Sequence, residues 1–236
     1  MALPKISHPI FELTVPSTKQ KIKYRPFLVK EEKILLMAAQ GEDPEEIINS
    51  IKQVIGNCIV SENVRLEDLT TFDLEYLFIK IRARSVNNII KLTYRDSEDD
   101  KKYDIEVNLD DVEIKFNNNH SNKIEVSDTM GIYLKYPQMS ITNSLKNSDT
   151  ETELFFNILK KCIDKVYDGN NEYYASDSTE EELDSFIQSL DVSSFKKIQS
   201  FFSTMPKLYY ETKYVNSNGK ERTITLSSLN DFFSLG

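Results

Sequence analysis

A single proline, Pro26, constrains the fold most, because it separates an extended segment from a helix. Proline disfavours the α conformation for the residue before it, so the strand predicted over residues 20–25 must finish at Arg25. Residues 30–40 then carry apolar side chains at helical spacing, and Gly41 stops the pattern. The early change from strand to helix predicts helices that pack on short antiparallel strands.

The remaining periodic segments divide into helices and strands. Asp43 is a predicted N-cap with Pro44 at the first helical position, where the missing N–H is not needed. Apolar spacing predicts helices over residues 30–40, 44–58, 70–84, 154–166, 179–190 and 192–204. Alternation predicts strands over residues 11–15, 20–25, 89–94, 103–109, 112–116, 124–126, 132–136, 171–175, 208–215 and 222–226. The predicted fold class is α+β, with helices packed on antiparallel β-hairpins.

The predicted elements form two consecutive regions. Residues 1–140 hold the N-terminal hairpin, helices and antiparallel strands, and residues 141–236 hold a helical region with a C-terminal hairpin. Both regions share the order helix with an inward cysteine, connector, helix and hairpin. Residues 51–109 and 158–226 are therefore a candidate helix-helix-hairpin pseudo-repeat, although chance similarity of α+β patterning is an alternative.

Three polar segments are predicted to lie at loops. The Asn218-Gly219 pair predicts a tight hairpin turn, because both residues tolerate positive φ angles. Residues 96–102 contain four carboxylates and two lysines, and we expect them to be a solvated hairpin tip. Residues 117–122, which include His120, are expected to be a loop without a packing side chain.

Composition narrows the class of protein. The chain has 236 residues, of which 39% are hydrophobic and 11% aromatic, and this is typical of one large globular domain or two small ones. A net charge of -9 argues against a general phosphate-binding surface. The first residues lack the apolar core of an export signal, and no stretch of about 18 apolar residues suggests a membrane span. We therefore expect the protein to act in the cytosol of the cell that makes it.

Catalytic and metal-binding patterns are missing from the sequence. His8 and His120 are the only histidines, and neither is predicted to have a tuned pKa. Cys58 and Cys162 fall on apolar helix faces, so we expect buried thiols and no disulfide. Residues 164–175 resemble a calcium loop only in part, since Val166 and Ala175 occupy ligand positions. The sequence predicts no metal and no cofactor.

Two other classes of function have candidate residues. An enzyme with a carboxylate-based site would use Asp104, Glu106 and Glu113, but alternation places the first two on one outward face. A nucleic-acid-binding module would use four basic residues that are interleaved with apolar positions. These are Lys80, Arg82, Arg84 and Lys91. We expect neither an enzyme nor a nucleic-acid-binding protein.

Apolar and aromatic residues near the termini are the strongest candidates for contacts with a partner. The N-terminal arm has Ile6 and Ile10 without periodicity, and a strand with Tyr209-Tyr210 must turn one ring outward. Phe232 and Phe233 lie close to the C-terminus, where a segment frays unless it docks. We expect these six residues to bind a partner or a second copy, and we expect the fold to survive the loss of the two phenylalanines.

Four segments resemble the baseplate hub protein family of T4-like contractile-tailed phages. They are residues 24–37, residues 72–86, Tyr136-Pro137 and residues 201–208. Asn87 stands where many relatives have glycine, and asparagine also suits a left-handed helix end. The resemblance implies a non-enzymatic hub subunit or hub assembly factor, whose partners are other hub proteins and its own copies. It further implies assembly in the host cytoplasm and a place in the tail baseplate of the virion.

Overall fold

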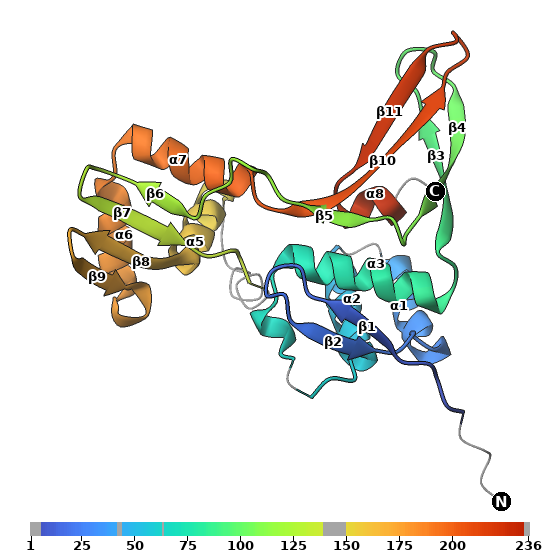
Figure 1. Cartoon of the computed structure of the whole chain (residues 1–236), viewed down its shortest axis with the longest axis horizontal. Helices are drawn as coiled ribbons and strands as arrows, with labels where there is room; N and C mark the ends of the chain where they lie inside the picture. Colours follow the sequence, from blue (N-terminus) through green and yellow to red (C-terminus); the bar gives the residue numbers. More distant parts are fainter. Residues whose placement is uncertain (1–5, 42–43, 63, 139–149, 234–236) are drawn as a thin grey trace, which may run out of the picture. The chain divides into compact units, whose positions relative to one another are not determined.

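The computed structural model describes residues 6–41, 44–62, 64–138 and 150–233, and it divides the chain into two compact units. The first unit combines Met1–Lys115 with Lys207–Gly236, and the second is Phe116–Pro206. Each unit has its own apolar core of helices packed on antiparallel strands, so the predicted α+β class is confirmed. Figure 1 labels the elements along the chain.

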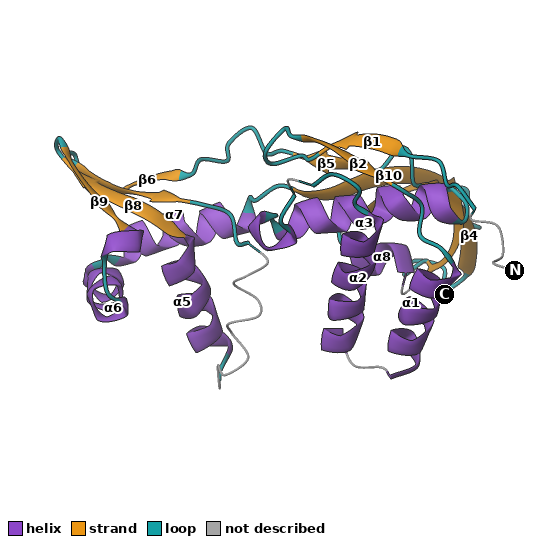
Figure 2. Ribbon diagram, turned by 90° about the horizontal axis from the view of Figure 1, so that it is seen from below, coloured by secondary structure: helices purple, strands orange, loops and turns teal. Residues whose placement is uncertain are grey.

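The first unit begins with the predicted hairpin, in which β1 (Phe11–Thr14) pairs with β2 (Lys21–Tyr24). Two neighbouring helices follow, α1 (Val29–Gly41) and α2 (Pro44–Cys58), and they lie side by side in Figure 2. Val54, Ile55 and Cys58 of α2 are buried as predicted, but Ile48 is 49% exposed. The predicted cap at Asp43 lies outside the described residues.

Helix α3 (Thr71–Ser85) is the central helix of this unit. Thr70 caps it through a reciprocal bond with Asp73, whose carboxylate also accepts from Ser17 in the β1–β2 turn. The short 3₁₀ helix η1 (Leu66–Asp68) precedes it. Its apolar spacing predicts an inward face, and the residues of that face are buried, namely Phe72, Leu74, Leu77, Phe78 and Ile81.

Two long hairpins complete the first unit. β3 (Ile89–Arg95) pairs with β4 (Lys102–Asn108), and β10 (Lys207–Val215) pairs with β11 (Glu221–Leu226) and with β5 (Glu113–Lys115). Helix α8 (Leu229–Phe233) closes the unit. The two hairpins lie side by side in Figure 1, and buried residues from both of them form one core with α3.

The charged tip of the β3–β4 hairpin is mostly exposed, as was predicted, but its carboxylates also contact the neighbouring hairpin. Asp96 is buried and accepts a hydrogen bond from the hydroxyl of Tyr214. Asp99 accepts from the backbone and side chain of Ser217, and Glu98 accepts from Lys220 at 2.6 Å. The acidic tip therefore meets the polar tip of the β10–β11 hairpin, a contact between distant segments that was not predicted.

The second unit is a four-stranded antiparallel sheet with helices on one face. The strand order is β6 (Lys123–Glu125), β7 (Met130–Leu134), β8 (Ile163–Asp168) and β9 (Asn171–Tyr174). The helices are α5 (Glu151–Cys162), α6 (Glu180–Ser189) and α7 (Val192–Ser203), with the 3₁₀ helix η2 (Ala175–Asp177) before α6. Figure 2 shows these helices on the same side of the sheet, so its other face is open.

The predicted helix over residues 154–166 was too long. Helix α5 ends at Cys162, and the chain enters β8 directly at Ile163. Val166 therefore pairs with Ile132 and Tyr173 in the sheet. Apolar spacing misled the prediction because Ile163 and Val166 also fit a strand, and the neighbouring strands decide between the two. Asp168-Gly169 accordingly forms a hairpin turn and does not follow a helix.

One backbone bond recurs in the two units, although the predicted repeat of residues 51–109 in residues 158–226 is divided between them. The N–H of Arg25, after the β1–β2 hairpin, donates to the carbonyl of Cys58 at 2.9 Å. The N–H of Lys135, after the β6–β7 hairpin, donates to the carbonyl of Cys162 at 2.8 Å. The helix that ends in the buried cysteine is α2 in the first case and α5 in the second. In both cases the residues after the cysteine return to the edge of the hairpin.

The division into units differs from the consecutive regions 1–140 and 141–236. Strands β6 and β7 belong to the same sheet as β8, so they pack in the second unit, whereas β10 and β11 pack in the first. Residues 139–149 of the expected boundary lie outside the described part.

Two further sequence predictions concern Asn87 and membrane spans. Asn87 does not take a positive φ angle, and its side chain accepts from the N–H of Ile89 instead. No helix within the described residues is long and apolar enough to span a membrane.

Candidate protein-interaction surfaces

The open face of the second unit's sheet carries a row of alternating lysines and tyrosines. The strand registers place Lys123 beside Tyr133, Tyr133 beside Lys165, and Lys165 beside Tyr174. The ammonium group of Lys165 lies 5.2 Å from the centre of the Tyr133 ring and 5.6 Å from that of Tyr174. Such distances allow cation–π attraction, which holds the rings in fixed positions on the sheet. We call this surface, together with Tyr167, the tyrosine face.

Tyr167 belongs to the same face and lies over a glycine. A Cβ atom added to Gly131 would be 2.5 Å from the hydroxyl oxygen of Tyr167 and 2.5 Å from the carbonyl oxygen of Ile124. The ring of Tyr167 therefore occupies the space that a side chain at position 131 would need. The centre of this ring is 5.7 Å from that of Tyr133 and 5.1 Å from the ammonium of Lys123. The face thus presents preformed aromatic area, which is the surface chemistry enriched in protein interfaces.

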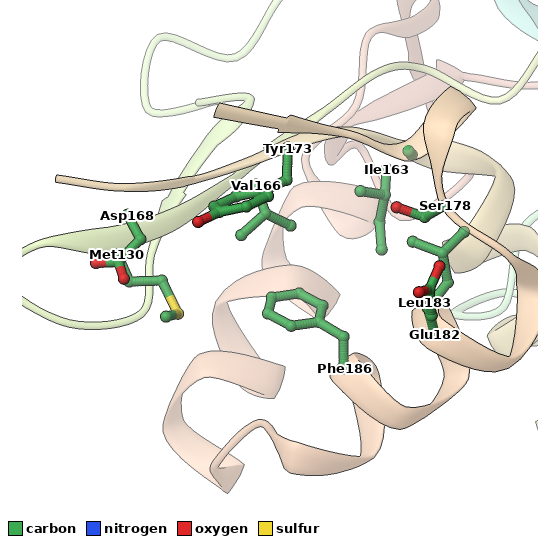
Figure 3. Close-up of a pocket in the computed structure, with 10 residues that line it drawn as sticks. Met130, Ile163, Val166, Asp168, Tyr173, Ser178, Glu182, Leu183 and Phe186 are labelled. Atoms are coloured by element: carbon green, nitrogen blue, oxygen red, sulfur yellow. The ribbon is translucent and has the colours of Figure 1, made fainter. Parts of the chain in front are cut away.

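The helical face of the sheet has a groove of about 290 Å³ beside its edge. Figure 3 shows Val166 and Tyr173 on the sheet side and Leu183 and Phe186 on the helix side. Met130 and Asp168 close one end, and Ser178 and Glu182 lie at the other. Tyr173 is 55% exposed although its ring lines the groove, so the groove is open to a ligand or a partner.

The structure separates the six residues that were predicted to bind a partner. Ile6 is 79% exposed and Ile10 is 58% exposed, so the N-terminal arm offers free apolar side chains. Tyr209 and Tyr210 are both half-buried, and the Tyr209 ring is covered by the ammonium of Lys115 at 3.9 Å. Phe232 is buried in the core of the first unit, and the side chain of Phe233 lies outside the described part.

The tyrosine face could not be predicted from the sequence because one of its strands has the apolar spacing of a helix. Tyr133 was in a predicted strand, but Tyr167 adjoined a segment that was predicted as helix, so no shared face could be drawn. The strand can be identified from its alternation with a period of two. Lys165 and Tyr167 point to one face of the sheet, and Val166 and Asp168 point to the other.

His120 was expected to lie in a loop without a packing side chain. In the structure its ring is packed against aromatic residues. Its ring stacks on Tyr136 and Phe201, with centroids 5.5 Å and 4.9 Å away, and its Nδ1 is 2.9 Å from the hydroxyl of Thr204. Burial lowers the pKa of this imidazole below its ordinary value. His8 is exposed. The expectation failed because Phe201 comes from a helix 81 positions further along the chain.

The cysteines are buried as predicted. Burial raises the pKa of Cys58 to about 11 and that of Cys162 to about 12, so neither thiol is a ready nucleophile. Among the described residues, no group of three or more His, Cys, Asp or Glu side chains could hold a metal ion.

Several residues of the two other classes of function form contacts within the fold. Asp104 accepts from Thr93, and Glu106 lies 3.6 Å from Lys91, both on the outward face that alternation predicted. Lys80 is buried and donates to the backbone carbonyls of Leu109 and Asp110. The lysine is therefore used within the fold. The contacts at positions 91, 104 and 106 link β3 to β4 across one sheet face.

Comparison with known proteins gives one match. The sequence model of the family described as T4 bacteriophage base plate protein matches residues 8–234, nearly the whole chain. No curated protein and no solved structure matches the chain.

Proposed function

Since the chain belongs to the T4 bacteriophage base plate protein family, we propose that it is a base plate hub subunit or hub assembly factor that acts through protein–protein contacts. It is a structural component of the phage, and the finer role is our proposal. The proposal assigns no enzymatic step and no cofactor to the chain. Its partners are other hub proteins, and the contacts form in the host cytoplasm during assembly.

The tyrosine face is the observation that carries this proposal. Tyrosine buries apolar area while its hydroxyl keeps a hydrogen-bonding group at the rim, and it loses little side-chain entropy on binding. Lys123 and Lys165 already hold the rings of Tyr167 and Tyr133 in place, so a partner finds a preorganised surface. The exposed Ile6 and Ile10 add apolar side chains that a partner can cover.

A polyanion is a weaker candidate for this face than a protein. Single-stranded nucleic acids also stack on tyrosines, but they require a groove of unpaired basic groups. Here Lys165 is 2.6 Å from Glu172, and Lys123 is 3.5 Å from Glu125. The charges are therefore balanced by carboxylates on the same face, which favours a mixed-charge protein surface.

Co-purification from phage-infected cells tests the proposal. The tagged full chain is compared with a variant that carries Tyr133→Thr and Tyr167→Thr, because threonine retains strand propensity but removes the rings. We expect at least tenfold less base plate protein with the double variant at an unchanged melting temperature. Lys91→Thr, on the exposed face of β3, is the matched control and should leave association unchanged.

Equal recovery of base plate proteins by the double variant would contradict the role of the tyrosine face. Mass spectrometry of mature virions then separates the two finer roles. A hub subunit remains in the virion at a fixed copy number, whereas an assembly factor is present in infected cells but missing from purified phage.

A further inference from the structure

Strand β9 is an edge of the four-stranded sheet, and the backbone groups on its outer side can be assigned residue by residue. Asp168 and Asn171 close a two-residue loop in which Gly169 has a φ of 59°, as in a type II′ hairpin turn. The closing pair of such a hairpin exchanges both backbone hydrogen bonds, and the pairs then alternate. Asn171 and Tyr173 therefore use their N–H and C=O groups toward β8. Glu172 and Tyr174 direct theirs away from the sheet, where the carbonyl of Tyr174 accepts a 3.4 Å bond from the hydroxyl of Ser178 that an added strand would replace.

The groove beside this edge fixes which side chains an added strand would need. Tyr173 shares its sheet face with Val166, and both line the groove opposite Leu183 and Phe186. A segment that bonded to Glu172 and Tyr174 would place the residue opposite Tyr173 on that same face. Its side chain would then extend the apolar lining of the groove. The residues on either side of it would point to the opposite face, toward the Glu172 side chain.

Charge around the edge is mostly negative. Residues 166–195 contain eight carboxylates and no lysine or arginine. Lysines of other segments pair with three of them, because Lys165, Lys161 and Lys160 contact Glu172, Glu180 and Asp184. Asp168 and Glu182 line the groove itself. An occupant with basic side chains is attracted to this region, and an acidic one is repelled.

We propose that the β9 edge and its groove bind an extended segment of a partner protein in which apolar residues alternate with lysine or arginine. The segment adds a fifth strand to the sheet, a mode in which backbone bonds supply affinity and alternate side chains supply specificity. This inference deepens the proposed function and rests on it, because it names the chemistry of one hub partner.

A labelled peptide that alternates lysine with valine over seven residues is the probe, measured by fluorescence anisotropy with the full chain. We expect saturable binding, and at least tenfold weaker binding of a peptide of the same composition with its valines in one block. Replacing lysine by glutamate should weaken binding to a similar extent. In a ¹⁵N-labelled chain, the amides of Glu172 and Tyr174 should shift on binding more than those of Asn171 and Tyr173.

Two matched variants at one position isolate the backbone bond. Glu172→Ala removes the carboxylate but keeps the outward N–H, whereas Glu172→Pro also removes the N–H, and proline is tolerated on an edge strand. We expect the proline variant to bind about tenfold more weakly than the alanine variant, which itself loses only the attraction between the Glu172 carboxylate and the lysines of the peptide. Ser178→Trp, which fills the groove from the side of α6, should weaken binding independently if the proline variant is poorly folded.

Equal binding by the alanine and proline variants together with unchanged binding by Ser178→Trp would overturn the proposal. So would a concentration-dependent dimer that Glu172→Pro abolishes, since the occupant would then be a second copy. The two proposals fail separately. If Glu172→Pro and Ser178→Trp still co-purify with base plate proteins while the tyrosine-face variant does not, the edge inference is wrong and the proposed function stands.

Discussion

The hydroxyl of Tyr214 donates a hydrogen bond to the buried carboxylate of Asp96, and this contact joins the tips of two hairpins that are 118 residues apart in the chain. The guanidinium of Arg222 lies 3.6 Å from the same carboxylate. Bonds from Tyr214 and from the backbone of Glu98 hold the pKa of Asp96 below its usual range. Burial and the Asp96 charge raise the pKa of Tyr214 to about 12, so the phenol stays protonated as the donor.

Replacing Tyr214 by phenylalanine should loosen the contact between the hairpin tips. The variant leaves the Asp96 carboxylate without its hydroxyl donor, and a buried acceptor that loses a donor destabilises the fold. We expect the melting temperature to fall by about 5 °C. Tyr209→Phe is the control, because its hydroxyl donates to the exposed Glu211. Equal melting temperatures for the two variants would show that the Asp96 contact adds no stability.

Replacing Glu75 by glutamine should make the protein more stable at high pH, where the buried carboxylate of the wild type is ionised. Burial raises the pKa of Glu75 to about 7, the nearby Asp231 adds to the rise, and a bond from the Leu229 backbone opposes it. The folded state therefore binds a proton up to about pH 7, so this stabilisation is present below pH 4.5 and lost as the pH rises through 7. We expect Glu75→Gln to be more stable than the wild type at pH 8, by up to about 3 kcal/mol, but not at pH 4.

Urea unfolding at the two pH values measures this difference. Glu106→Gln is the matched control, since Glu106 is exposed on the outward face of β4. A stability gain that is the same at pH 4 and pH 8 would point to better packing and would contradict the assignment to Glu75 ionisation.

His120 should make the second unit sensitive to acid. Burial lowers the pKa of its ring, and Nε2 has no hydrogen-bond partner in the part of the chain that the structure describes. The folded state therefore resists protonation, so this contribution to stability is present above pH 6.5 and is lost as the pH falls below that value. His120→Phe keeps the stacking on Tyr136 and Phe201 but cannot titrate. We expect the fall in melting temperature between pH 7.5 and pH 5 to be smaller in this variant than in the wild type, whereas His8→Phe should change nothing.

Replacing Phe232 by serine should destabilise the first unit. Phe232 is 1% exposed and packs in the core formed by α3 and the two long hairpins. Removing a buried phenylalanine ring from a core costs about 3–5 kcal/mol. The melting curve is the measurement, and Ile10→Ser on the exposed arm is the control that should leave it unchanged. A lower melting temperature would contradict the sequence prediction that the fold survives without Phe232. A normal melting curve together with lost association would instead support that prediction.

Local patterns predicted most elements because each depends on neighbouring residues. The β1–β2 hairpin, the inward residues of α3 and the α+β class all follow from periodicity and turn chemistry. The errors arose where distant segments decide. Val166 joined a strand because Ile132 and Tyr173 flank it, and His120 is packed because Phe201 meets it.

The sequence by itself determined the periodic elements, the buried cysteines and membership of a phage base plate family, since these depend on residues that are close along the chain or on a family pattern. Only the tertiary structure decided which charges are paired and which aromatic rings are exposed. Asp96 is buried because Tyr214 and Arg222 reach it from another hairpin, and Phe232 is buried because residues from both hairpins surround it. Tyr133 and Tyr167 share an open face because strands from distant segments pair in one register. Burial and pairing across such separations are properties of the packed chain, and no local pattern encodes them.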